Sequence, residues 1–384
     1  MTYVFWGLLG LVIYVYAGYP LLLLLLRALR GPRKIALGDI EPPVTLIISA
    51  FNEGAVIGEK LENSLALDYP RDRLQILVVS DASTDDTDAV VSSFASRGVE
   101  LLRMQERGGK TAGLNAAMLR ARGEIVVFSD ANAMYGKDVI RKLVRNFSDP
   151  SVGAAVGEST YVDPQGAAEQ TEGLYWRYEV AIKRLESELG SVVGGDGAIY
   201  AIRRSLYEPM PADAISDFVN PLQIVRAGHR CIYESDARSY EKAADSFDKE
   251  FRRKVRIVNR AWRALLRMRS LLNPFRYGLF SIQLFSHKLL RWLVPVFLLA
   301  LIFVNAALLD EGRIYQAAMA AQAVFYALAL AGYLVRARQQ MPAVLSIPFF
   351  FCLANLGSAC GIIDALRGKT YTTWNTVRLP QRSA

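Results

Sequence analysis

Apolar residues gather in two kinds of segment, long uninterrupted runs and short runs. Residues 1–26 contain no charged side chain and form a run long enough to cross a bilayer as a helix. Further long runs occupy residues 292–309, 314–335 and 341–363. The pattern predicts a membrane span at the start of the chain and several near its end, around a more polar middle region.

The short runs of the middle region alternate with helical patterns. Continuous β-branched and aliphatic residues predict strands covered on both faces, and apolar residues three and four apart predict helices. The predicted strands are residues 44–49, 75–80, 99–103 and 125–128, and the helices between them are 53–67, 85–96 and 111–120. This order predicts an α/β fold with a parallel, doubly wound sheet and right-handed crossovers.

The region after this sheet has weaker signals. Residues 172–189 predict a helix, and residues 192–202 predict glycines followed by a strand. Residues 217–227 predict a short helix with Ser216 as its N-cap and Gly228 at its C-terminal end.

Residues 251–269 place apolar residues at helical spacing among many basic ones. A basic amphipathic helix that contains a tryptophan, here Trp262, is typical of a membrane surface. Nucleic-acid binding is the alternative, and the apolar run that follows disfavours it. Some of these arginines could instead reach a diphosphate.

Composition and charge agree with one soluble domain joined to membrane spans. The chain is 52% hydrophobic, 21% charged and has a formal net charge of +8. Basic residues at 27–34 follow the first run, which predicts an outside N-terminus and a cytoplasmic middle region. Counting the spans places the C-terminus outside the membrane. The positive-inside rule disfavours the basic residues at 367–378 on that side, so a re-entrant last apolar run remains an alternative. With two histidines and three unpaired cysteines, neither a His-based zinc site nor a disulfide framework is expected.

Polar clusters follow three of the predicted strands, at residues 49–53, 80–86 and 129–132. The carboxyl ends of parallel strands meet at one edge of the sheet, where such folds bind ligands. Asp130 and Asn132 are two positions apart, so both oxygens can face one cation or diphosphate, although an Asx turn is the alternative. No GxGxxG motif follows a strand. GGKT at 108–111 lacks the first glycine of a phosphate loop.

Four motifs resemble membrane-bound family 2 glycosyltransferases, which include bacterial polysaccharide synthases and the cellulose, chitin and hyaluronan synthases. In the family's order and spacing they are SAFNE (49–53), VVSDASTDDT (78–87), GGKTAGLN (108–115) and SDAN (129–132). The resemblance covers residues 44–270, and the flanking spans also fit. It implies a Rossmann-like GT-A fold and transfer with inversion from a nucleotide sugar, with Mg or Mn as cofactor.

The resemblance implies a role for each matched residue. Asn52 and Glu53 match residues of the nucleotide pocket, and Asp81 matches the residue that contacts the base, usually uracil. Lys110 and Asn115 match residues beside the diphosphate, and Asp130 and Asn132 match the residues that hold its metal ion. Asp217 stands where the family has its catalytic base.

The chemistry of these residue types agrees. A divalent ion with Lys110 or Arg256 would stabilise the charge that develops on the leaving diphosphate. A carboxylate such as Asp217 can take the proton of an acceptor hydroxyl. The alternative is that Asp217 only stabilises the dipole at the start of its helix. Asp196, between glycines, is a candidate for acceptor contacts, with a simple turn as the alternative.

Two departures from the family pattern matter. Asn132 replaces the second aspartate of the metal motif, and an amide oxygen binds a hard cation without charge. The QxxRW motif keeps Arg253 and Arg256 as donor-side cations but lacks its tryptophan, which in polymer synthases lies at the acceptor channel. Trp262, one or two turns later, is an acceptor-side candidate.

The sequence therefore predicts a metal-dependent, inverting hexosyl- or N-acetylhexosaminyltransferase, multi-pass in the cell inner membrane. A UDP-sugar donor, a glycan or lipid-linked acceptor and membrane lipid are expected as partners, export proteins could join them, and nucleic acid is not expected. Alternatives are single addition to a lipid or polyprenyl phosphate, and a catalytically silent scaffold. A channel is disfavoured because the predicted spans lack charged residues between their ends. The predicted regions are an N-terminal span (1–29), a cytoplasmic catalytic domain (42–245), an amphipathic interfacial helix (246–275), a C-terminal transmembrane helix bundle (276–368) and a tail (369–384).

Overall fold

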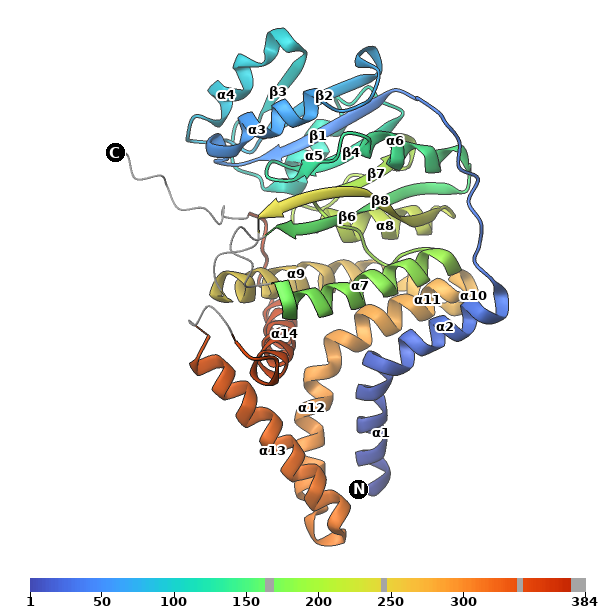
Figure 1. Cartoon of the computed structure of the whole chain (residues 1–384), viewed down its shortest axis with the longest axis vertical. Helices are drawn as coiled ribbons and strands as arrows, with labels where there is room; N and C mark the ends of the chain where they lie inside the picture. Colours follow the sequence, from blue (N-terminus) through green and yellow to red (C-terminus); the bar gives the residue numbers. More distant parts are fainter. Residues whose placement is uncertain (163–168, 243–246, 337–340, 374–384) are drawn as a thin grey trace.

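A computed structural model describes residues 1–162, 169–242, 247–336 and 341–373. The described chain forms three tiers: a sheet with its flanking helices, a layer of helices beneath the sheet, and apolar helices that project from this layer (Figure 1). The tiers follow the division of the sequence into a polar middle region and apolar ends. The predicted boundary at residues 245–246 and the tail beyond residue 373 lie outside the described residues.

In the described part of the chain, eight strands form one sheet in the order β3-β2-β1-β4-β7-β6-β8-β5. The first four are parallel, whereas β7 runs antiparallel to β4 and β6 runs parallel to β8. The prediction of a parallel sheet is right for the first half, whereas the second half is mixed. The strand bounds are β1 Val44–Ala50, β2 Leu74–Ser80, β3 Val99–Arg103, β4 Ile125–Asp130, β5 Met134–Tyr135, β6 Val152–Val162, β7 Ile199–Arg203 and β8 Arg230–Lys242.

The sheet has a hydrophobic core on each face because successive residues of a strand point to opposite sides. On β1, Ile47 belongs to the core that includes α5, α8 and α9, and Leu46 belongs to the core that includes α3 and α6. The helix bounds in this tier are α3 Gly54–Leu65, α4 Thr87–Ser93, α5 Lys110–Met118, α6 Val139–Val144 and α8 Ser216–Arg226.

Helix α8 differs in one detail from its prediction. Ser216 is its first helical residue, and Ile215 holds the N-cap position without a side-chain hydrogen bond, so the predicted Ser216 cap is wrong. Gly228 has φ +87° after the helix end, as a C-terminal glycine should.

The layer beneath the sheet contains α7 Glu169–Leu189, α9 Phe247–Arg267, α10 Pro274–Tyr277 and α11 Leu279–Leu284. Helix α9 is the predicted basic helix, but several of its arginines bind protein. Arg260 donates to the Asp213 carbonyl (3.2 Å), and Arg263 and Arg267 pair with the Asp213 carboxylate (2.8 Å each). These three cations hold the segment before α8, while the interfacial position of the helix stays a prediction.

Among the described residues, four helices are long and apolar enough to cross a membrane: Thr2–Arg30, Leu279–Ala306, Arg313–Leu334 and Ala343–Leu366. The second begins at Leu279, well before the predicted start at residue 292. It therefore contains Lys288, which lies outside the predicted span.

Two of these helices bend at π-helical segments that touch. The first consists of α1 Thr2–Ile13, η1 Tyr14–Gly18 and α2 Tyr19–Arg30, and the second of α11, η7 Phe285–Leu290 and α12 Arg291–Ala306. The Tyr14 hydroxyl and Ser286 Oγ are 2.8 Å apart, which joins η1 to η7. Helix α1 then packs along α12, and α2 packs against α7 (Figure 1). A π segment is a common cause of such a bend.

The last apolar helix, α14 Ala343–Leu366, runs beside α9. Phe349 packs on Phe247 near the start of α9, with ring centroids 5.6 Å apart. Near its other end, Asn259 of α9 donates to the Gly361 carbonyl (3.4 Å) and to the Lys369 carbonyl (3.1 Å). The chain that leaves α14 therefore continues to the sheet domain.

Candidate active site

The turns after β1 and β2 are bonded to each other. Asn52 has φ +53°, a conformation that Asn tolerates better than most residues, and its Oδ1 accepts from the Thr84 amide (2.8 Å). The Glu53 amide donates to Thr87 Oγ1 (2.8 Å). Both predicted residues lie at the carboxyl edge of the sheet.

Asp81 holds a glycine loop. Its side chain is 2% exposed and accepts from the backbone amides of Gly108 (2.8 Å) and Gly109 (2.9 Å). A Cβ at Gly109, where φ is +84°, would overlap the carbonyl oxygen of Thr372. Residues 369–373, predicted only as part of a tail, thus lie against this loop, while the contact of Asp81 with a base stays a prediction.

Four elements converge next to this loop. Lys110 Nζ, at the start of α5, pairs with Asp130 at the end of β4 and donates to the Gly197 carbonyl before β7 (3.1 Å). A Cβ at Gly197 would lie 3.2 Å from Asp217 Oδ2, at the start of α8, and 3.4 Å from Lys110 Nζ. The structure thus brings Lys110, Asp130 and Asp217 together, and the glycine makes their approach possible.

The Asp217 carboxylate is buried, and the charges around it act in opposite directions. Burial raises its pKa, the charge of Lys110 opposes this effect, and the charges of Asp196 and Asp130 add to it. Asp217 Oδ1 is buried and has no hydrogen-bond partner among the described residues. A carboxylate with a raised pKa and a free oxygen can accept a proton from a bound hydroxyl.

Glu241, at the end of β8, joins the site although it was not predicted. Asn132 Nδ2 lies 3.5 Å from its Oε2, a long contact for a hydrogen bond. Burial raises the pKa of Glu241 to about 8, with the charges of Asp130 and Asp196 adding to the rise. Because β8 alternates charged and small residues, no strand was predicted there, and no pattern in the chain selected this glutamate.

The donor set near Asp130 suits a hard divalent ion. Asp130, Asn132 and Glu241 offer carboxylate and amide oxygens, and a diphosphate could complete the coordination. Within the described residues, no group of three or more His, Cys, Asp or Glu side chains is arranged for a metal ion. Binding would therefore depend on the donor substrate as well as on the protein.

Residues 45–209 match the family described as Glycosyl transferase family 2. The chain contains a family 2 glycosyltransferase domain. The structure is similar to that of a mannosyltransferase from Pyrobaculum calidifontis, solved with GDP-Man and Mn2+. The TM-score is 0.73, and the match covers 95% of this chain and 99% of that chain at 24% identity. This likeness confirms the predicted GT-A fold, here with a mixed sheet and with apolar helices on both sides of the domain in sequence.

Curated relatives of the family 2 domain act on different molecules, as their names state. A β-monoglucosyldiacylglycerol synthase of Synechocystis is 37% identical over 29% of this chain and 24% of its own length. An N-acetylglucosaminyltransferase of Rhizobium is 27% identical over 62% of this chain and 57% of its own. A poly-β-1,6-N-acetyl-D-glucosamine synthase of Staphylococcus aureus is 23% identical over 58% and 56%. The chain thus spans between about a quarter and three fifths of these relatives.

Three predicted site residues make other contacts. Asn115 accepts from the Tyr207 hydroxyl (2.6 Å) and the Met210 amide (3.0 Å), so it anchors that loop, while its place beside the diphosphate stays a prediction. Arg253 pairs with Glu250 (2.7 Å), one turn earlier on α9. Trp262 packs on Trp292, with ring centroids 6.4 Å apart.

Two further predicted residues stay near the site. Burial lowers the pKa of the Arg256 guanidinium, and the negative charge of nearby Asp130 partly offsets this effect. Asp196 Oδ1 accepts from the Ala198 amide (3.2 Å), which fits the turn alternative, while its charge still acts on Asp217.

A buried lysine behind the metal motif was also missed. Lys60 on α3 has no exposed surface, donates from Nζ to the Ala133 carbonyl and lies 3.8 Å over the centre of the Tyr135 ring. Burial lowers its pKa to about 7, against the attraction of Asp130 and Glu241. Lys60 thus fixes the backbone that follows Asn132.

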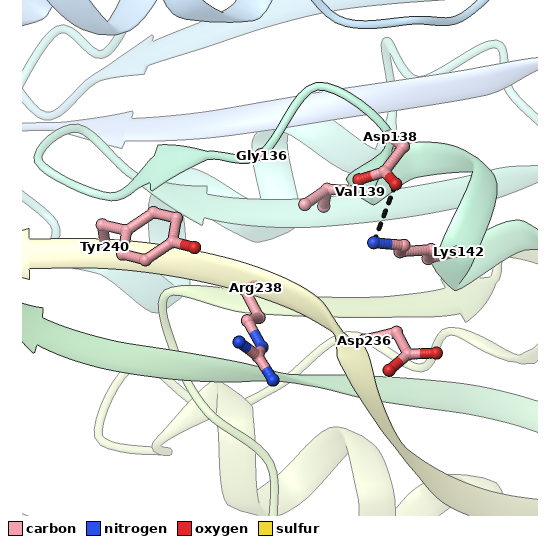
Figure 2. A pocket seen from close by; sticks show the side chains of 7 residues that line it. All are labelled: Gly136, Asp138, Val139, Lys142, Asp236, Arg238 and Tyr240. Atoms are coloured by element: carbon pink, nitrogen blue, oxygen red, sulfur yellow. Dashed lines mark ion pairs between the residues drawn. The ribbon is translucent and has the colours of Figure 1, made fainter.

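A cavity of about 340 Å³ lies on another part of the domain. Figure 2 shows the side chains that line it, among them the ion pair between Asp138 and Lys142 (2.7 Å), with Tyr240 on the opposite side. None of the predicted site residues lines this cavity, so the cavity adds nothing to the candidate active site.

Proposed function

We propose that this protein is an inverting glycosyltransferase that moves a hexosyl or N-acetylhexosaminyl group from a nucleotide sugar to a polysaccharide or lipid-linked acceptor at the membrane. A UDP-sugar is the expected donor. The observation that carries the proposal is the convergence of Lys110, Asp130 and Asp217 at one sheet edge of a family 2 domain.

The proposed donor site uses charge to stabilise the leaving group. Asp130 and Asn132, with Glu241 beside them, would hold Mg or Mn, and the similar mannosyltransferase binds Mn2+ with GDP-Man. The ion would stabilise the negative charge that develops on the diphosphate. Lys110 and Arg256 add positive charge close to Asp130.

The proposed acceptor site uses Asp217. Its carboxylate takes the proton of the acceptor hydroxyl while the hydroxyl oxygen bonds to the anomeric carbon and the nucleoside diphosphate leaves with the electron pair of the broken bond. A single displacement of this kind inverts the anomeric centre. The raised pKa of Asp217 brings the base closer to the operating pH.

The proposed setting is the cell inner membrane, with the N-terminus outside and the catalytic domain in the cytoplasm. The contacts of α14 with α9, and of residue 372 with the glycine loop, support a chain that returns to the catalytic side after α14. We accordingly assign α9 and residues 369–373 to the catalytic unit, together with residues 42–245.

The test is nucleotide release by the purified protein in lipid, with Mg or Mn, across UDP-sugars and GDP-mannose. Release with one donor is expected, and Asp130→Asn should abolish it. Silence with every donor and a range of acceptors would favour the scaffold alternative. The size of the product then separates polymer synthesis from single addition. The packing of Trp262 on Trp292 favours single addition, because the Trp262 ring is then not available to stack on a growing glycan.

A further inference from the structure

The membrane side of the site contains a lysine to which the proposed function gives no role. Lys288 lies on η7, in the second apolar helix. A Cβ at Gly194 would lie 3.8 Å from Lys288 Nζ and 3.7 Å from the Phe218 ring. Phe218 directly follows Asp217, so the ammonium reaches the same short segment as the proposed base.

That segment links the lysine to the reacting groups. A Cβ at Gly195 would lie 2.8 Å from the Asp217 carbonyl oxygen, and one at Gly197 would lie 3.2 Å from Asp217 Oδ2. Residues 194–197 span at most about 10 Å even when fully extended. The positive charge and the proposed base are thus separated by a distance that one or two sugar rings can bridge.

The neighbours of Lys288 are already paired with each other. His287 Nδ1 lies 2.8 Å from Glu186 Oε1, and Arg291 pairs with Glu179. Among the residues that the structure describes, the Lys288 ammonium has no hydrogen-bond partner and no ion-pair partner. The charges of Glu179 and Glu186 act on this ammonium, but its donors stay unused, and unused donors on a buried cation in a membrane-crossing helix commonly mark a place where a ligand binds.

The backbone around Lys288 is also unusual. Segment η7 is π-helical and is held to the π-helical η1 by the contact between Tyr14 and Ser286 (2.8 Å). Segments of this kind are rare and occur often at functional sites. Ile282 and Phe285, on the same continuous helix, are 41% and 44% exposed, so an apolar chain can lie along this helix next to the lysine.

We propose that Lys288 binds a phosphate group of a lipid-linked acceptor. The inference rests on the proposed function and names its acceptor class: a sugar joined through phosphate to an apolar chain. The sugar hydroxyl bonds to the anomeric carbon of the donor, its proton passes to Asp217, and the nucleoside diphosphate leaves with the bonding electrons. The acceptor phosphate stays intact and serves only as the anchor at Lys288.

The experiment compares two synthetic acceptors that differ in one feature. One is a sugar linked to a prenyl chain through phosphate, and the other is the same sugar linked directly to the same prenyl alcohol. For the unmodified protein, kcat/KM should be ~10- to 100-fold higher with the phosphate-linked acceptor, as expected for one charge-assisted hydrogen bond. Equal kcat/KM values would overturn the proposal, whether or not any variant folds.

Three variants sharpen this comparison. Lys288→Gln should remove the preference by raising KM for the phosphate-linked acceptor, and Lys288→Arg should retain most of it. Arg276→Gln is the matched control, because Arg276 is an exposed cation on the nearby α10, and it should keep the preference. Equal losses of Lys288→Gln on both acceptors would contradict the proposal.

Two measurements distinguish phosphate binding at Lys288 from a failure of the transferase reaction and from binding of bulk lipid. Slow donor hydrolysis without acceptor should be the same in the unmodified protein and Lys288→Gln; its absence from the unmodified protein would count against the proposed function itself. If Lys288 binds bulk lipid headgroups instead, the effect of Lys288→Gln will change between neutral and phosphatidylglycerol vesicles and will not depend on the acceptor.

Discussion

The two halves of the sheet satisfy their polar groups in different ways. In the first half, Asn52 bonds to Thr84, Asp81 to the glycine loop, and Lys110 to Asp130. Beside the second half, Asp217 Oδ1 on α8 is buried without a partner among the described residues. Most of these groups on the proposed donor side are therefore paired within the protein, although Ser49 Oγ is also buried without a partner among the described residues, whereas the proposed base keeps an open carboxylate oxygen that a ligand could satisfy.

The largest expected effect falls on the acceptor side. Asp217→Asn keeps the shape of the side chain but removes the base, so transfer should fall by ~10²- to 10⁴-fold while donor affinity is retained. Transfer rates and donor Kd measured side by side check this result. Asp138→Asn, at the cavity of Figure 2, is the control and should behave like the unmodified protein. An unchanged rate in Asp217→Asn would remove this residue as the base.

A smaller effect is expected where the two halves meet at the proposed metal site. Glu241→Gln removes the carboxylate that β8 brings beside Asn132, so Mn2+ affinity in the presence of UDP should fall ~10-fold or more. Electron paramagnetic resonance of free Mn2+ measures this directly. Glu124→Gln, just before β4 and far from its carboxyl end, is the control. Equal affinities in both variants would show that Glu241 does not act on the ion.

Substitutions of glycine test whether the contact between the glycine loop and residues 369–373 affects donor binding. Gly109 (φ +84°) and Gly98 (φ +88°) share a positive φ, but Gly98 is left-handed (ψ 16°), whereas Gly109 (ψ 164°) has a conformation that is essentially restricted to glycine. A Cβ at Gly98 would meet open space, and one at Gly109 would overlap Thr372. Gly98→Ala should cost only the backbone strain, about 1 kcal/mol. Gly109→Ala should in addition weaken donor binding several-fold. Donor Kd and thermal melting of both variants separate the two contributions, and similar donor affinities would contradict the role of residues 369–373.

The smallest effect concerns stability and pH. The pKa of Lys60 is lowered to about 7 in the folded protein from 10.5, so the unfolded chain binds more protons between these values. The contribution of Lys60 to stability should therefore rise as pH increases from about 7 to 10.5. In Lys60→Met this contribution is absent, and the difference in Tm between the two proteins should change in favour of the unmodified protein across that window. A constant difference would argue against a buried, titrating ammonium.

The first half of the fold could be predicted because its signals are local. Strand β1 is buried along its whole length, so an apolar run marks it clearly. Strand β8 was missed because its charged residues alternate with small ones and its pairing partner β6 is distant in sequence. With β8 unpredicted, Glu241 had no place in the site.

The remaining misses have similar causes. Lys60 looks like an ordinary helix-surface lysine in the sequence, and only the packing of α3 on the loop after Asn132 buries it. Asp217 and Lys110 were identified through the family motifs, but their approach depends on Gly197, which no motif marks. Lys288 fell outside the predicted span because the helix starts earlier than its most apolar part.

The contact between Gly109 and Thr372 has a consequence for the order in which the protein is made. Gly109 leaves the ribosome before the last three apolar helices, and residue 372 leaves after all of them. The glycine loop can therefore fold early, but it receives its last neighbour only after those helices have been delivered to the membrane. A donor pocket completed in this sequence would keep the newly made catalytic domain from reaching full affinity for its donor until membrane assembly is finished.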